Sequence, residues 1–320
     1  MLFVPMALFP WRKPMNISDK FRFRAYRVNL VAADDISLPP YSGSAIRGLF
    51  GHALRLVSCP PQCKDPAKCI IGNACPYFFI FESQRHDTPA GLKNYPHPIV
   101  LEPPTQTRIK KGESFSFNFI LFGKSIMFLP HIVYAICCMG ELGLGKGRGK
   151  FKLEKIESIP SGKLVYNPES GELLSNGEDI IPTKKELGNR LTVEFVTPLR
   201  LKNKGQYDYQ PSFQSIIRSI LRRVTLLAKG YCDYNLNFDF KNILKSAENI
   251  EIEKSYIRKV TVNRYSGRQK RKVPLYGALG KITYSGENLK MFSELLSIAE
   301  WIHVGGATIF GFGKIKLHTK

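Results

Sequence analysis

Acidic residues are scarce in this chain of 320 residues. It contains 26 Asp and Glu against 47 Lys and Arg, which gives a formal net charge of +21. A surplus of positive charge of this size is typical of proteins that bind a polyanion such as nucleic acid. A membrane surface is the other acidic partner that the charge alone allows.

Long hydrophobic runs are also missing. No stretch approaches the roughly 18 apolar residues that a membrane-spanning helix needs. Residues 1–11 form too short a segment for a secretory signal, and they lack its basic start. We therefore expect a cytoplasmic protein with no membrane partner. Apolar residues still make up 43% of the chain, enough for a large core, and the length predicts about two domains.

Several familiar catalytic motifs do not occur. The chain has no phosphate-binding Walker loop after a strand and no His-Glu-x-x-His sequence, and its glycine-rich segments are not followed by the helix of a dinucleotide-binding loop. We therefore do not expect a nucleotide-binding Rossmann domain.

Two glycine-rich segments stand out among the residues that are present. Gly143–Leu153 and Gly305–Leu317 each follow a predicted helix, and Gly-Lys-Phe-Lys-Leu in the first corresponds to Gly-Lys-Ile-Lys-Leu in the second. Dense glycine lets a bulky partner approach the backbone amides, and the basic neighbours favour an anion. The repeat predicts two similar domains that share one polyanion. The residues expected to contact it are Lys146, Arg148, Lys150, Gly311 and Gly313.

The hydrophobic pattern predicts the same order of elements in both halves, strand-helix-strand-strand-helix-strand. This order predicts an α+β protein with two tandem ferredoxin-like domains, each an antiparallel four-stranded sheet with two helices on one face. The predicted elements of the first half are 21–33, 44–57, 77–81, 114–122, 128–142 and 151–156, with one extra strand-like run at 98–101; those of the second half are 191–197, 212–229, 256–263, 275–283, 289–301 and 313–318.

The predicted boundaries follow from this order. Residues 1–156 form the N-terminal domain and 188–320 the C-terminal domain. Between them, 157–187 is rich in Pro, Gly, Ser and Asn, which indicates a linker or an exposed hairpin.

Four of the seven cysteines fall within 17 residues, in a segment that also contains three prolines and is followed directly by a fourth. In a reducing compartment such a cluster favours a metal site over disulfides, because neighbouring thiolates need a cation to offset their repulsion. We expect zinc, although the spacing is wider than in common zinc knuckles; four unligated thiols and an iron–sulfur cluster are the alternatives. The expected ligands are Cys59, Cys63, Cys69 and Cys75.

The predicted helix 44–57 has two distinct faces. Its apolar residues form one stripe, and the opposite stripe carries two glycines, a histidine and two arginines. Glycine within a helix costs about 1 kcal/mol relative to alanine, so two on the outer face suggest that a ligand lies against it. The flanking arginines disfavour a protonated His52, and a neutral imidazole could accept a proton from a ribose 2′-hydroxyl. A merely solvated histidine is the alternative.

A second basic run, 258–272, has seven Lys or Arg and no acidic residue. It lies between two predicted strands, with Ser266-Gly267 as a turn, which favours a hairpin along an RNA backbone over a simple solvated face. The expected contacts are Arg264, Tyr265, Arg268, Lys270 and Arg271.

Together these segments resemble a known family. Tyr41-Ser-Gly-Ser-Ala-Ile-Arg-Gly-Leu-Phe-Gly-His-Ala-Leu-Arg55, the cysteine cluster with Cys75-Pro-Tyr-Phe-Phe-Ile-Phe-Glu82, 264–272 and the loop 305–314 are similar to the CRISPR-associated endoribonuclease that cuts repeat RNA into guide RNAs, the sixth Cas family of the RAMP superfamily. The resemblance covers nearly the whole chain from about residue 22.

The resemblance implies metal-independent cleavage of CRISPR repeat RNA by attack of the 2′-hydroxyl, which leaves a 2′,3′-cyclic phosphate and a 5′-hydroxyl. His52 corresponds to the family's general base. Any zinc would then be structural, since four cysteine ligands leave no open position. The implied partners are repeat RNA, guide RNA and a CRISPR effector complex. Further candidate catalytic residues are Tyr41, Arg47, Arg55 and Lys146.

Two other functions fit parts of the sequence. A non-catalytic RAMP subunit of a guide-RNA complex would share the glycine-rich loops and the helix after Tyr41. A zinc-containing RNA binder of the translation apparatus would share the charge and the cysteines, but it would not need the duplicated loops. Cleavage of repeat RNA in the presence of EDTA distinguishes the three.

Overall fold

The computed structural model describes residues 17, 20–82, 95–266 and 271–319. In the first half, β1 (Phe23–Ala32) pairs antiparallel with β5 (Ser114–Phe122) and with β6 (Phe151–Ile159), and β5 pairs with β3 (Ile99–Glu102). Alternate residues of β5 point into the core, because side chains of a strand alternate between its two faces. These strands form one sheet with the order β3-β5-β1-β6.

Two helices pack together in this half. α1 (Gly43–Ser58) and α2 (Leu129–Leu142) contact each other, and α2 also packs on β6. Ile46, Phe50 and Leu54 recur at helical spacing and are buried, as the apolar stripe of the sequence predicts.

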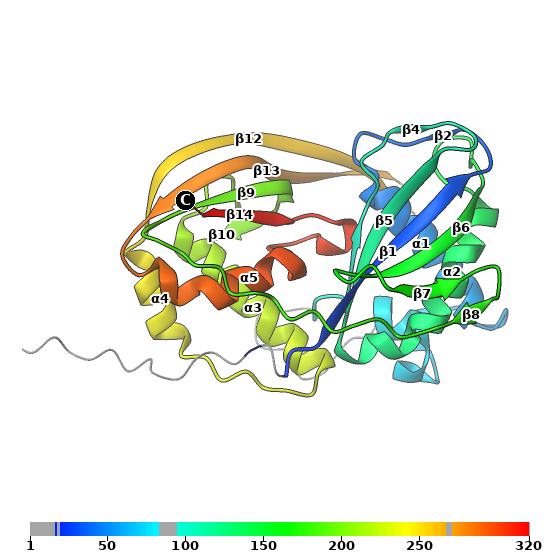
Figure 1. The fold of residues 1–320 in the computed structure, drawn as a ribbon, viewed down its shortest axis with the longest axis horizontal. Coiled ribbons are helices and arrows are strands. Elements are labelled where there is room, and N and C mark those ends of the chain that lie inside the picture. The colour runs from blue at the N-terminus through cyan, green and yellow to red at the C-terminus, as the bar shows by residue number, and fades with distance from the viewer. Residues whose placement is uncertain (1–16, 18–19, 83–94, 267–270, 320) are drawn as a thin grey trace, which may run out of the picture.

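The second half repeats this arrangement. β9 (Arg190–Leu199) lies between β13 (Arg271–Ser285) and β14 (Ile315–Thr319), and β13 pairs with β12 (Glu251–Ser266). The strand order is β12-β13-β9-β14. In chain order these are the second, third, first and fourth strands of their half, and the first sheet has the same arrangement. Helices α3 (Phe213–Tyr231) and α5 (Ser293–Ile302) lie beneath the sheet (Figure 1). The predicted tandem ferredoxin-like fold is confirmed.

Several shorter strands and helices connect the main elements of the two halves. Most lie in segments that the sequence pattern left as loops. They are β2 (Ile36–Ser37), β4 (Arg108–Ile109), β7 (Leu164–Asn167), β8 (Glu172–Leu173), β10 (Leu201–Asn203), β11 (Gln206–Asp208) and α4 (Phe240–Glu248), with helical turns at Pro66–Lys68, Gly72–Ala74, Phe78–Glu82 (η3), Gly123–Phe128 (η4), Leu289–Phe292 (η5) and Thr308–Phe310 (η6).

One predicted strand is wrong. Residues 77–81 were expected to be extended, but Phe78–Glu82 forms a π-helical turn that buries Phe79 and Phe81. The strand at this place in the order is β3, which corresponds to the extra run predicted at 98–101. Aromatic residues favour strands where they can pack on a pleated surface. Here Phe79 and Phe81 belong to a helical turn and are buried in the core from there.

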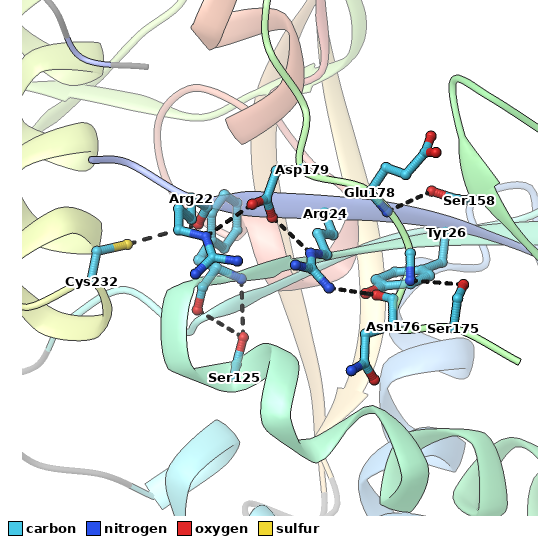
Figure 2. Close-up of polar contacts among 12 residues, drawn as sticks. Arg22, Arg24, Tyr26, Ser125, Ser158, Ser175, Asn176, Glu178, Asp179 and Cys232 are labelled. Atoms are coloured by element: carbon cyan, nitrogen blue, oxygen red, sulfur yellow. Dashed lines mark hydrogen bonds and ion pairs between the residues drawn. The ribbon is translucent and has the colours of Figure 1, made fainter. Parts of the chain in front are cut away.

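The segment predicted as a linker or an exposed hairpin contains a hairpin, β7–β8, which belongs to the first sheet. β6 continues to Ile159, beyond the expected end at 156, and β7 and β8 extend the sheet at its edge. The chain then crosses β1, where Asp179 pairs with Arg22 and Arg24, and Tyr26 donates a hydrogen bond to the Asn176 carbonyl (Figure 2). Pairing to β1 explains why this polar segment is ordered.

One helical segment among the described residues, Gly123–Leu142, is long and apolar enough to cross a membrane, so the expectation that no stretch approaches this composition is wrong. Half of the segment is buried inside the protein. Its apolar residues include Leu129, Ile132 and Ile136, which belong to the hydrophobic core. Packing in the core therefore accounts for its composition.

A buried polar cluster joins the two halves. Glu102, at the end of β3, accepts hydrogen bonds from His303 Nε2 at 3.0 Å, Lys314 Nζ at 2.9 Å and Asn118 Nδ2 at 2.9 Å. Nδ1 of the fully buried His303 lies 2.8 Å from the Phe312 carbonyl. Both ring nitrogens thus face acceptors, which only the protonated imidazole satisfies. Burial opposes ionisation of Glu102, but these partners outweigh it and hold the pKa of Glu102 well below its usual range.

We expect Glu102→Gln to lower the free energy of unfolding by about 3 kcal/mol at pH 7, because it leaves a buried cation without its charged partner. Urea unfolding followed by circular dichroism measures the change. The control is Glu178→Gln, which removes a carboxylate from an exposed pair with Lys163 and should leave the stability almost unchanged.

The difference in stability between the parent protein and Glu102→Gln should also depend on pH. A carboxyl group whose pKa is lowered by folding stabilises the native state above its ordinary pKa, near 4.5, and this contribution is lost as the pH falls through the lower native value. The difference between the parent and Glu102→Gln should therefore narrow below about pH 4.5. An equal loss for both variants at pH 7 would contradict the importance of this cluster.

Candidate functional site

The outer face of α1 lies at the boundary between the two halves, where α1 contacts η6. Gly48 and His52 are exposed there, one helical turn apart. A Cβ atom at Gly48 would meet nothing within 4 Å, so packing does not require a glycine at this position. Gly51 is different, because its Cβ would lie 3.6 Å from the Phe81 ring. Only Gly48 therefore leaves open surface beside the imidazole.

Arg47 is the most constrained residue of this face. Its guanidinium carbon lies 4.5 Å from the centre of the Phe81 ring. Burial lowers the pKa of Arg47, and the positive charge of Arg264 lowers it further, while Tyr77 and Glu82 raise it. Its Nε atom is buried and has no hydrogen-bond partner among the described residues.

Arg264 reaches the same place from the other half of the chain. It lies near the end of β12, in the long β12–β13 hairpin that extends toward α1 (Figure 1). Its guanidinium carbon is 5.0 Å from the centre of the Phe310 ring in η6. Its Nε atom is also buried without a partner in the described part of the chain.

The positive charge of Arg264, from the other domain, therefore acts on Arg47, and each of the two side chains has a buried N–H group with no acceptor among the described residues. Both conditions are costly in the protein alone. A bound phosphate would offset the repulsion, since guanidinium groups match phosphate oxygens well. The charges and the buried donors of Arg47 and Arg264 thus favour an anion.

Phe81 owes its position to the π-helical turn. His97 Nδ1 lies 2.9 Å from the carbonyl oxygen of Ile80, and its ring contacts Phe81 edge to face at 6.1 Å. Burial lowers the pKa of His97 to about 4, so the ring is neutral at pH 7 and donates to Ile80. Sequence reasoning missed Phe81 and His97, because the segment was interpreted as a strand. Short π-helical turns are frequent at functional sites.

Tyr41, a candidate for catalysis, holds the second glycine-rich loop in place. Its hydroxyl donates to the Phe310 carbonyl at 2.8 Å, and its ring packs edge-on against Phe312. Burial, with the charge of Glu102, raises the pKa of Tyr41 far above its usual value. A Cβ at Gly43 would lie 1.9 Å from the same carbonyl, so the close approach of α1 to the loop requires glycine there. These contacts give Tyr41 a structural role.

Arg55 also makes a contact within the protein. Its Nη2 atom donates to the Cys63 carbonyl at 3.1 Å. The side chain therefore links the last turn of α1 to the cysteine-rich loop, one turn away from His52.

The glycines of the second glycine-rich loop lie against protein backbone, whereas the sequence predicted that they would lie against a ligand. Gly311 and Gly313 both have positive φ, and a Cβ would lie 2.7 Å from the Leu101 carbonyl oxygen at the first and 1.9 Å from that of Val304 at the second. These glycines let the loop pack against β3 and its own strand. The expectation that they clear space for a ligand does not match this packing.

The first glycine-rich loop has similar internal contacts. Gly145 and Gly149 approach the carbonyl oxygens of Ser37 and Asp35. Its basic side chains are exposed, and Lys150 pairs with Glu141 at 3.3 Å. This loop packs on the β2 segment, whereas the second packs on β3 and α1, so the structure does not bring the two loops together at one surface. Exposed residues of the first loop are Lys146, Arg148 and Lys150.

The basic run 258–272 forms the predicted hairpin, because Ser266 pairs with Arg271 across β12 and β13. Arg271 is exposed at the start of β13. Arg268, Lys270 and the side chain of Tyr265 lie outside the described residues.

Three of the four clustered cysteines lie close together. Burial and the neighbouring thiols of Cys75 and Cys63 raise the pKa of the Cys59 thiol to about 12. Cys75 is buried and the other three are partly exposed. Among the described residues, no group of three or more His, Cys, Asp or Glu side chains is arranged to hold a metal ion.

Comparison with known proteins agrees with the resemblance in the sequence. Residues 193–315 match the family described as CRISPR-associated endoribonuclease Cas6, and residues 21–178 match a family described as an N-terminal domain. An uncharacterised protein of Archaeoglobus fulgidus is 27% identical over 289 residues, which cover 88% of this chain and 93% of that one.

Solved structures with the same fold include Cas6 proteins. A Cas6 product complex superposes with a TM-score of 0.57 at 17% identity, over 93% of this chain and 99% of that one. Thermus thermophilus Cas6 gives 0.54 at 16% identity, with the same coverage. A partial Cas6-RT-Cas1–Cas2 complex gives 0.59 at 14% identity, over 94% of this chain and 46% of that one. These likenesses establish the tandem fold.

Proposed function

We propose that this chain, a Cas6-type CRISPR RNA-processing protein, cleaves repeat RNA without a metal ion and leaves a 2′,3′-cyclic phosphate and a 5′-hydroxyl. The product would pass to a CRISPR effector complex as guide RNA. The observation that carries this proposal is the pair Arg47 and Arg264, whose buried Nε atoms have no acceptor among the described residues. Two arginines from different domains make a site for a phosphodiester at the boundary that both domains share.

The proposed reaction is an in-line transfer at this phosphate. The 2′-oxygen of the ribose forms a bond to phosphorus, and the bond from phosphorus to the 5′-oxygen breaks. His52 accepts the proton of the 2′-hydroxyl, and the departing 5′-oxygen takes a proton from water. Arg47 and Arg264 stabilise the charge that develops on the non-bridging oxygens. Lys146 lies on the first glycine-rich loop, which packs on β2, so we assign it no part in this step.

Gly48 has a defined part in this proposal. Because a side chain there would meet no protein atom, the glycine keeps the surface beside His52 free for RNA. Tyr41 and Arg55 make contacts within the protein, and Arg47 is assigned to the phosphate. We therefore propose His52 as the general base.

We expect His52→Ala to cleave repeat RNA at least about a hundredfold more slowly than the parent, the usual scale for loss of a positioned base, while binding it nearly as well. Single-turnover cleavage in EDTA measures the rate. The control is His131→Ala, which removes another exposed histidine, on α2.

A 2′-deoxy substitution at the cleaved nucleotide should block the reaction, since it removes the nucleophile. If the parent binds repeat RNA but leaves it intact, the non-catalytic RAMP subunit is the better assignment. Parental rates in His52→Ala would show that another group is the base.

Replacing Gly48 by alanine allows the effect on helix stability to be measured separately from the effect on RNA binding. We expect Gly48→Ala to raise the free energy of unfolding by up to about 1 kcal/mol, because alanine favours the helix, and yet to weaken RNA binding. Gly51→Ala is the matched control: its methyl group contacts Phe81, so it should add similar stability without loss of affinity. Unfolding in urea and fluorescence anisotropy with labelled RNA measure the two effects. Unchanged affinity in Gly48→Ala would mean that RNA does not approach α1 here.

We also propose that Cys59, Cys63, Cys69 and Cys75 bind a structural zinc ion. Their clustering in the sequence and the closeness of Cys59, Cys63 and Cys75 support this proposal. Binding would draw Cys69 toward the other three thiols. Four thiolate ligands complete tetrahedral coordination, so the ion would order the loop next to α1 and would take no part in cleavage.

The zinc proposal predicts about one zinc per chain in protein purified without chelators. Inductively coupled plasma mass spectrometry measures the metal. Cys63→Ser should lose it and unfold at a lower temperature, because metal binding is coupled to the order of the loop. Cys138→Ser, on α2, should keep the metal. Protein that is folded and active without stoichiometric metal would contradict the proposal.

A further inference from the structure

A second basic site lies on the C-terminal domain, away from α1. A cavity of about 460 Å³ is enclosed by α3, the β10–β11 hairpin and the first residues of the second glycine-rich loop, with Tyr95 and Pro96 of the N-terminal half at one side. Neither the sequence motifs nor the proposed active site uses any of the side chains on α3. A volume of this size accommodates a nucleotide-sized ligand.

The lining of this cavity is strongly positive. It contains five basic side chains and a single carboxylate, Asp208. Within the described residues, none of the five pairs with an Asp or Glu side chain; Arg200 instead donates to the Tyr207 hydroxyl at 2.7 Å, and Arg218 to Gln214. The basic residues are Arg200, Lys202, Arg218, Arg222 and Arg223.

Arg223 is the strongest indication of a ligand. Its side chain is only 6% exposed, and its Nε donates to the Ile302 carbonyl at 2.7 Å. Its Nη2 atom is buried and has no partner in the described part of the chain. Burial lowers the pKa of Arg223 to about 9, which still leaves it charged at pH 7. A buried cation with a free donor is costly unless an anion binds beside it.

The residues around the cavity favour a polymeric ligand over a small ion. Arg218 and Arg222 are exposed on α3, one helical turn apart, and continue the positive surface out of the cavity. A helical turn of about 5.4 Å approaches the spacing of successive phosphates along a nucleic-acid strand. An isolated phosphate would need only the buried part of this surface.

The second glycine-rich loop connects the cavity to the proposed active site. Gly305 and Gly306 line the cavity, and the Gly306 amide is bonded to the Arg200 carbonyl. A few residues later, Phe310 stacks on Arg264 and binds Tyr41. The loop thus lies between two sets of arginines, each of which includes a buried N–H group without an acceptor among the described residues.

We propose that the α3 cavity binds a backbone phosphate of the same RNA, at a nucleotide away from the bond that is cut. This inference rests on the proposed function. The cavity holds the strand and takes no part in the chemistry, so its loss lowers affinity and raises KM more than it lowers the rate at saturation. Arg218 and Arg222 are the accessible contacts, and Arg223 is the buried anchor.

The test uses the double variant Arg218→Ala/Arg222→Ala in the full chain. Both side chains are exposed, so the fold should survive, and the thermal midpoint checks this. We expect labelled repeat RNA to bind about tenfold more weakly, and the slope of log affinity against log salt to fall by about 1.4 for two lost contacts with single-stranded RNA. The matched control is Lys241→Ala/Lys245→Ala on α4, which removes the same charge from exposed positions of the same domain.

Each outcome has one meaning. Parental affinity and salt slope in the double variant overturn the inference. An unchanged affinity for RNA, together with calorimetric binding of inorganic phosphate that the double variant loses, would assign the cavity to a small anion and also overturn it. Failure of the parent to bind repeat RNA at all would instead refute the proposed function. An RNA affinity that falls in the double variant and not in the control supports the inference.

Discussion

The ionic cluster at Glu102 is the contact on which the arrangement of this protein depends. A carboxylate from the first sheet meets a buried imidazole and an amine from the second half of the chain, and the carboxylate and the imidazole would each be costly to bury without its partners. His303, with positive φ, lies at the end of α5, where the chain turns into the second glycine-rich loop. Because the cluster holds this turn against β3, η6 reaches α1. Rotation of one domain against the other would break the cluster and the phosphate site together.

The second glycine-rich loop shows how one short segment can serve two surfaces. At Gly311 and Gly313 a Cβ atom would lie so close to the carbonyl of Leu101 in β3 and to that of Val304, just after α5, that no other residue fits without movement. The loop can therefore bring Phe310 beneath Arg264 while its first residues line the α3 cavity. The close packing of the loop fixes the position of its backbone. The buried guanidinium N–H groups beside it, which have no acceptor among the described residues, favour the binding of an anion.

The hydrophobic pattern predicted most of the fold, because helices such as α1 and α3 have a clean apolar stripe and the strands have branched and aromatic residues. It failed at 77–82, where a run of aromatic residues forms a π-helical turn whose shape depends on partners in α1 and at His97. It also misjudged the glycines of both loops, since a glycine required by a nearby carbonyl cannot be distinguished in sequence from one that faces a ligand.

The sequence alone predicted a polyanionic ligand, through its net positive charge, and it determined the duplicated order of elements, since both depend on composition and local periodicity. It also placed Gly48 and His52 on one face of a helix, because helical spacing is a local property. Only the tertiary structure decided that Arg264 meets Arg47 across the domain boundary, that Tyr41 and Arg55 bind protein atoms, and that Arg223 lies buried beside a cavity with a free donor. These depend on packing between residues far apart in the chain, which no local pattern encodes.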